Sequence, residues 1–195
     1  MSKVTVAPTG SAEMPRYTLV QRLLHWLIAV LVLLALIFGG TIGYLGFNGL
    51  RDTFGPTGTD FIYTTHKTLG ILILGFMVLR LITRLAFGKP AYAQPLPLPQ
   101  RLASQVVHTL FYPLLLLMPV LGWLATASGG FPVHLFHLEL PGLIGRNKEL
   151  SETLFFWHQM VGYTLVTLIA LHIAGAIYHW RVRRDGVMER MSLFR

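Results

Sequence analysis

Four long apolar segments, separated by short stretches that hold most of the charge, constrain the fold of this 195-residue chain more than any other feature. They run from Leu23 to Leu45, from Phe61 to Phe87, from Val106 to Ala127 and from Leu154 to Trp180. Each is long enough for a helix to cross a hydrocarbon layer about 30 Å thick. Only 12% of the residues are charged, whereas an average soluble domain has about a quarter. The pattern predicts an all-α integral membrane protein, a bundle of four transmembrane helices.

The boundaries of the membrane domain follow from the composition on either side of it. Residues 1–18 are polar and do not resemble a cleaved signal peptide, so we expect an N-terminal extension. The four-helix domain is predicted over 19–185, and a basic cytoplasmic tail over 186–195. The stretch GKPAYAQPLPLPQR between the second and third spans predicts an extended linker. Pro113 and Pro119 predict a kink in the third span.

The lysines and arginines predict the orientation. Only four of them fall on the side that contains the loops after the first and third spans: Arg51, Lys67, Arg146 and Lys148. The other twelve share the opposite side: Lys3, Arg16, Arg22, Arg80, Arg84, Lys89, Arg101, Arg181, Arg183, Arg184, Arg190 and Arg195. This asymmetry places both termini in the cytoplasm. The net charge of +8 then reflects topology and attraction to anionic lipid, and no nucleic acid is needed to explain it.

The chain has no cysteine and eight histidines, and these counts limit the cofactors that it can bind. Disulfides, thiolate zinc sites, Cys-ligated iron–sulfur clusters and covalently attached haem are excluded. Placing an ionisable side chain within a membrane span has a high free-energy cost, so each histidine there is a functional candidate. His172 follows His158 in the fourth span by about four helical turns. The two therefore lie on one helix face, about 21 Å apart along its axis.

Each of these two histidines has a predicted partner at its own depth. His66 opens the second span from the outer side, level with His158, and His25 opens the first span from the cytoplasm, level with His172. The arrangement predicts two bis-histidine haems, which transfer electrons more readily than they bind oxygen. Each of the four histidines is followed four positions later by a small residue, which leaves a gap for a flat macrocycle. These residues are Ala29, Gly70, Gly162 and Ala176.

Three other interpretations of the histidines remain open. A single intramembrane histidine is often a hydrogen-bonded structural residue. Zinc is a common partner of histidine, but it gathers three or four ligands at one point, whereas these histidines divide two and two. A transporter without haem is the third alternative, although the spans contain almost no Asp or Glu to line an ion path.

Further polar residues are candidates for contact with a cofactor near the cytoplasmic surface. Arg80 follows His66 by about four helical turns, which places it at the depth of the inner haem. A guanidinium there can pair with a haem propionate. His108 and His179 lie at the cytoplasmic ends of the third and fourth spans. They are candidates for contact with a propionate or a quinone, and the alternative for each is an ordinary interfacial residue.

The outer side offers a second group of candidates. Lys67 is adjacent to His66, and Arg146 and Lys148 lie in the loop before the fourth span. These cations can pair with outer-haem propionates or attract an anionic reductant, and a solvated surface is the alternative. The segment FPVHLFHLELPG, which contains His134 and His137, is expected to form a short interfacial segment over the outer haem.

Several motifs surround these residues in a fixed order and spacing. The first two spans contain R-L-L-H-W at His25 and H-K-T-L-G with V-L-R-L-I-T-R from His66 to Arg84. The third span contributes V-V-H-T-L-F-Y-P-L-L-L-L-M-P-V-L-G, and the fourth W-H-Q-M-V-G-Y followed by the second histidine of that span, His172. Together these motifs resemble the bacterial cytochrome b561 family, four-helix di-haem proteins that include a membrane superoxide oxidase. The resemblance covers nearly the whole chain from about Tyr17, and the loop around His134 matches least.

The resemblance implies two haems b, with His25, His66, His158 and His172 as their ligands, and ubiquinone as an electron partner. In its superoxide-oxidising members, superoxide gives up an electron at the outer side and the quinone becomes quinol. We therefore expect an oxidoreductase of the superoxide:ubiquinone type in the bacterial inner membrane. The alternative is an electron-relay or anchor subunit that passes electrons between quinol and a periplasmic redox protein.

Overall fold

The computed structural model describes residues 15–91 and 95–194, so most of the predicted extension over 1–18 lies outside the described residues. The fold is mainly helical, as predicted, with one short β-hairpin that was not. In chain order its elements are α1 (Leu19–Phe87), α2 (Leu98–Ser128), β1 (Val133–Leu135), β2 (Leu138–Leu140), α3 (Lys148–Tyr178) and the π-helical turn η1 (His179–Arg183). Three helices in the described part of the chain are long and apolar enough to cross a membrane: α1, α2 and α3 continued by η1.

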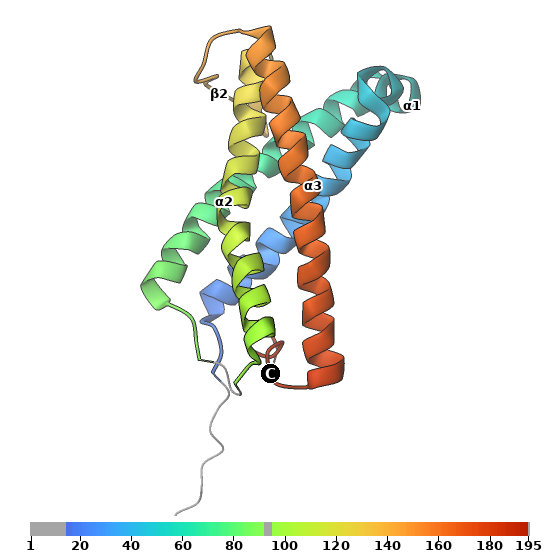
Figure 1. Cartoon of the computed structure of the whole chain (residues 1–195). Coiled ribbons are helices and arrows are strands. Elements are labelled where there is room, and N and C mark those ends of the chain that lie inside the picture. The colour runs from blue at the N-terminus through green and yellow to red at the C-terminus, as the bar shows by residue number, and fades with distance from the viewer. Residues whose placement is uncertain (1–14, 92–94, 195) are drawn as a thin grey trace, which may run out of the picture.

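The first two predicted spans lie together in α1, whose 69 residues are not uniformly helical. Gly46 and Gly55 have φ values of 64° and 69° with ψ near 180°, a conformation that favours glycine, and Pro56 follows directly. The helix rises to this region and then returns alongside itself (Figure 1). We call 19–45 the first arm of α1 and 56–87 its second arm.

Local sequence determines where the helices begin and end. Thr18 and Gln21 form a capping box at the start of α1, and Gly88, with φ 64°, ends the helix. The side chain of Asn147 accepts a hydrogen bond of 3.0 Å from the backbone N–H of Leu150 at the start of α3.

The linker before α2 is shorter than predicted. Helix α2 begins at Leu98, directly after Pro97, so the last residues of the predicted linker are helical. Pro99 lies in the first turn of the helix, where proline is tolerated because the N–H groups there have no partner within the helix. The helix then continues through Pro113 and Pro119, as helices in membranes can.

The helices share one apolar core, and most of their remaining apolar surface faces outward. Ile28 and Val32 from the first arm pack with Ile73 and Met77 from the second. Partly buried apolar side chains of α2 and α3 complete this core: Leu115, Leu116 and Ile169. Many other large apolar side chains along the helices are exposed, such as Ile37 and Leu85. Exposed apolar helix faces are suited to lipid contact.

The antiparallel hairpin of β1 and β2 lies against the second arm of α1. Its pairs are Val133–Leu140, His134–Glu139 and Leu135–Leu138. The backbone N–H of Phe136 donates to Thr68 Oγ1 at 3.1 Å, and Lys67 Nζ donates to the carbonyl oxygen of Pro132 at 2.9 Å. Because Lys67 and Thr68 directly follow His66, these bonds hold the hairpin beside that histidine.

The residues after η1 fold back against the start of α1. Arg16 donates three hydrogen bonds of 2.6–3.1 Å to tail carbonyl oxygens, those of Glu189, Ser192 and Phe194. Trp26 Nε1 donates to the carbonyl oxygen of Met191 at 2.9 Å. The tail is therefore an ordered segment that contacts the first arm near His25.

Replacing Arg16 with alanine is expected to loosen the tail without unfolding the helices. The change removes three charge-assisted hydrogen bonds, and even about 1.5 kcal/mol of lost stabilisation raises the population of an open tail about tenfold. Hydrogen–deuterium exchange of a peptide covering 188–194 measures this. The variant Arg101→Ala, which removes an exposed arginine on the same side of the molecule, is the matched control. Equal exchange in the two variants would mean that other contacts hold the tail.

Candidate functional site

The structure brings the four predicted haem-ligand histidines together as two pairs. His66, from the second arm of α1, and His158, from α3, have ring centroids 6.1 Å apart at an interplanar angle of 86°. His25, from the first arm, and His172, from α3, have ring centroids 6.1 Å apart at 82°. We call the first the outer pair and the second the inner pair. Helix α3 contributes one member to each.

The spacing within each pair fits two imidazoles that share one metal ion. Metal–nitrogen bonds of about 2 Å on both sides of an ion, with about 1 Å from each nitrogen to its ring centre, place two ligating rings about 6 Å apart. In the described part of the chain, no three His, Cys, Asp or Glu side chains form a group that could hold a metal ion. Two axial imidazoles are a ligand set that suits haem iron.

Backbone carbonyl groups fix the tautomer of both outer histidines. The Nδ1 atom of His66 lies 3.1 Å from the carbonyl oxygen of Ala35, and that of His158 lies 2.9 Å from the carbonyl oxygen of Met118. A carbonyl oxygen can only accept, so each Nδ1 carries the hydrogen and donates it. The Nε2 atom of each ring therefore has a free lone pair, as a metal ligand requires.

Two glycines make room for the outer pair. A Cβ atom added at Gly39 would lie 2.7 Å from His66 Cε1, and one at Gly122 would lie 2.9 Å from His158 Cε1. Both distances are too short for any side chain unless an imidazole moves. A cavity between the two rings is otherwise lined by apolar residues of α1, α2 and α3, including Val32, Leu115 and Leu165. The outer pair therefore faces an apolar space, as a haem site requires.

The sequence reasoning missed Gly39 and Gly122, although the spacing that identifies them was available. Gly39 follows His25, and Gly122 follows His108, by about four helical turns. The same interval separates His158 from His172, and His66 from Arg80. Each apolar segment thus presents residues at two depths. At the outer level these are Gly39, His66, Gly122 and His158, and at the inner level they are His25, Arg80, His108 and His172.

Of the small residues that were expected to border a macrocycle, Gly70 lines the cavity between the outer imidazoles. A Cβ atom at Gly70 would contact Pro119 at 3.8 Å, and one at Gly162 would contact Met118 at 3.3 Å. Both neighbours belong to α2. The closest approach to the outer imidazoles therefore comes from glycines on adjacent helical segments rather than from the residue four positions along the same helix.

The inner level is more polar than the outer level. The ring of His108 lies 5.1 Å from that of His172, and its Nδ1 lies 2.6 Å from the carbonyl oxygen of Ser104. Arg80 Nη1 donates to the carbonyl oxygen of Gln21 at 3.2 Å, and its charge interacts with the imidazoles of the inner pair. In contrast to the outer pair, His25 and His172 make no hydrogen bond within the described residues.

The remaining candidates lie away from both pairs or are engaged elsewhere. Lys67 donates to the hairpin and interacts with the charge of Asp60. His179 Nδ1 lies 2.7 Å from Asp185 Oδ2, so it belongs to the junction between η1 and the tail. His134 is part of β1 and its buried Nδ1 has no partner in the described residues, whereas His137 is exposed in the hairpin turn.

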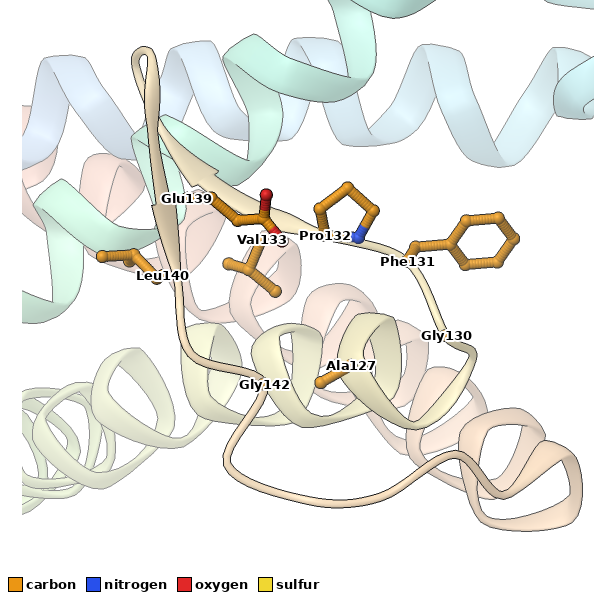
Figure 2. A pocket seen from close by; sticks show the side chains of 8 residues that line it. All are labelled: Ala127, Gly130, Phe131, Pro132, Val133, Glu139, Leu140 and Gly142. Atoms are coloured by element: carbon orange, nitrogen blue, oxygen red, sulfur yellow. The ribbon is translucent and has the colours of Figure 1, made fainter.

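A second cavity, of about 260 Å³, lies between the hairpin and the C-terminal end of α2. Figure 2 shows the side chains around it: Ala127, Phe131, Pro132, Val133, Glu139 and Leu140, with the backbone of Gly130 and Gly142. Glu139 is the one ionisable residue among them. The side chain of Arg146 lies beside Gly130, where an added Cβ atom would be 3.0 Å from its Nε, so charges of both signs border this cavity.

Comparisons with known proteins point to one family. A family model described as Prokaryotic cytochrome b561 matches residues 16–192. The chain is similar to Cytochrome b561 homolog 1 of Escherichia coli K12, with 26% identity over 181 residues that cover 91% of this chain and 97% of the relative. It is 28% identical over 177 residues to the Probable superoxide oxidase CybB of Yersinia pestis, covering 90% and 95% of the two chains. Cytochrome b562 of Cereibacter sphaeroides is also 28% identical over 177 residues, covering 91% and 95%.

Proposed function

The chain belongs to the prokaryotic cytochrome b561 family, a family of membrane haem proteins, and we propose that it transfers electrons from superoxide at the outer membrane surface to ubiquinone. The observation that supports this most strongly is the presentation by α3 of one histidine to each of two imidazole pairs. Each pair is proposed to hold one haem b, which makes two per chain.

We propose that the chain crosses the bacterial inner membrane four times, with both termini in the cytoplasm. The two arms of α1 would each cross once, because Gly46 and Gly55 interrupt the helix between them. The bend of α1 and the hairpin lie toward one end of the molecule, while both ends of α1, the start of α2 and the C-terminal tail lie toward the other (Figure 1). The four-helix domain is proposed over 19–185, with the tail following it.

In this proposal His66 and His158 would hold the outer haem, and His25 and His172 would hold the inner haem. Haem iron bound there would supply a one-electron couple. The carbonyl groups of Ala35 and Met118 orient the outer imidazoles through their Nδ1–H groups. The protein would thus position and orient the imidazoles, while the redox chemistry would belong to the cofactor.

Three more residues are proposed to contact the cofactors or the quinone. Arg80 and His108 are at the inner level, where a guanidinium and an imidazole can bind a propionate or a quinone oxygen. Lys67 is proposed to bind an outer propionate. To do so it would have to exchange its present partner, the carbonyl group of Pro132.

Superoxide as the donor has two sources of support. One relative is named a probable superoxide oxidase. The four lysines and arginines on the outer side of the proposed topology are matched by five carboxylates. The attraction of an anion is therefore proposed to be local, at Lys67 beside His66.

Purified holoprotein tests the proposed reaction. Superoxide generated in solution is expected to reduce the haems within the mixing time, and a soluble ubiquinone is expected to reoxidise them, both followed by haem absorbance. Superoxide dismutase added beforehand should abolish the reduction. Right-side-out vesicles should react with external superoxide, and inverted vesicles should not. Haems that respond to neither reagent without a partner protein would instead support a relay subunit.

A further inference from the structure

The two haem sites differ in the groups that surround their imidazoles. Arg80 and His108 belong to the inner level, whereas Gly39 and Gly122 belong to the outer level, about four helical turns away in depth. We infer that a haem held by the inner pair has the higher redox potential, and that Arg80 is the residue mainly responsible. The inference rests on the proposed binding of one haem by each pair.

Hydrogen bonding lowers the potential of the outer site. Both outer imidazoles donate from Nδ1 to a backbone carbonyl, which makes each ring a stronger electron donor to a metal. A more basic axial ligand stabilises the oxidised iron over the reduced iron. The inner imidazoles have no such acceptor within the described residues, so this stabilisation is confined to the outer site.

The charge of Arg80 raises the potential of the inner site. Reduction adds one negative charge, which a nearby cation stabilises, and the interaction is strong where water is excluded. The guanidinium interacts with neutral groups, the carbonyl group of Gln21 and the hydroxyl group of Tyr112. No carboxylate in the described residues forms an ion pair with it. Its charge therefore acts on the inner imidazoles without a counter-ion from the described side chains.

The outer level has no equivalent cation among the residues described. Gly39 and Gly122 have no side chain, and Lys67 is bonded to the hairpin, where Asp60 partly offsets its charge. Hydrogen bonding and charge therefore both place the redox potential of the inner site above that of the outer site. An electron shared between the two sites would reside mainly at the inner level, on the cytoplasmic side of the proposed topology.

A spectroelectrochemical titration of the holoprotein tests this order. Wild type is expected to give two midpoints. The variant His66→Ala, which keeps the inner pair, should retain the higher midpoint, and His172→Ala should retain the lower one. Arg80→Gln should lower the higher midpoint by at least the equivalent of a tenfold change in equilibrium constant, about 59 mV for one electron. Arg80→Lys keeps the charge and should preserve most of that midpoint, and Arg101→Gln, the exposed control, should change neither.

The possible failures can be told apart. If His66→Ala retains the lower midpoint, the inferred order is wrong, although two haems are still bound. If Arg80→Gln and Arg101→Gln behave alike, Arg80 does not set the potential. If Arg80→Gln loses the inner haem, its higher midpoint cannot be measured, and Arg80→Lys is compared with wild type instead. A higher midpoint that is about 59 mV lower in Arg80→Lys than in wild type would then refute the role of the charge. A holoprotein that contains fewer than two haems would contradict the proposed function itself.

Discussion

The variant His158→Ala is expected to contain one haem per chain, where the wild type contains two. Alanine removes the imidazole of α3 from the outer pair and leaves His66 to face a methyl group across the cavity. A haem with one protein ligand in a site built for two loses much of its affinity. The inner pair, about four turns away along α3, should keep its own haem, because none of its contacts involves position 158.

Haem stoichiometry measures this outcome directly. A pyridine haemochrome assay normalised to protein mass should give a ratio near two for wild type, and near one for His158→Ala, His66→Ala, His25→Ala and His172→Ala. The control His137→Ala removes an exposed histidine of the hairpin turn and should keep both haems. Two haems in His172→Ala, or one in wild type, would mean that the imidazole pairs are not two haem sites.

The variant Gly39→Ala is expected to weaken or abolish the outer haem while the inner haem stays bound. The new methyl group would lie 2.7 Å from His66 Cε1, and the ring cannot move away without stretching its bond to the carbonyl group of Ala35. Overpacking of this kind costs about 1–3 kcal/mol, which corresponds to a loss of affinity of roughly fivefold to 150-fold. The position is about four turns from His25, so the inner site should be unaffected.

A neighbouring glycine provides the matched control. A Cβ atom at Gly40 would meet nothing within 4 Å, so Gly40→Ala makes the same chemical change in the same arm without the clash. Absorbance spectra and haem content of the two variants, measured side by side, separate the steric effect from a general effect of alanine on the helix. Identical haem content in both would mean that the outer imidazole tolerates a displaced position.

Parts of this site could be predicted because a helix converts sequence spacing into depth. Hydropathy located the apolar segments, and an interval of about four helical turns placed His158 and His172 at two depths of one face. The same interval would have revealed Gly39 and Gly122. A search for ligands overlooks a glycine, however, because a glycine acts by leaving space.

Other features had no sequence signal strong enough to use. The acceptors of the outer Nδ1–H groups are carbonyl groups of Ala35 and Met118, and every residue has a carbonyl group. The hairpin has strands of only three residues, too short for an alternating pattern to be recognised. Helix α2 begins at Leu98 rather than at Val106 because hydropathy detects the part of a helix that suits hydrocarbon, and a helix continues beyond that part.

The shared interval between the two levels also restricts how this chain can change in length. One residue inserted between His158 and His172 would turn everything after it by about 100° around the helix axis and shift it by about 1.5 Å. His172 would then point away from His25, while the outer pair stayed intact. The same applies to the stretch between the levels in each of the other apolar segments. Insertions and deletions should be tolerated at the bend of α1, in the hairpin or at the termini, where no ligand geometry depends on the count of residues.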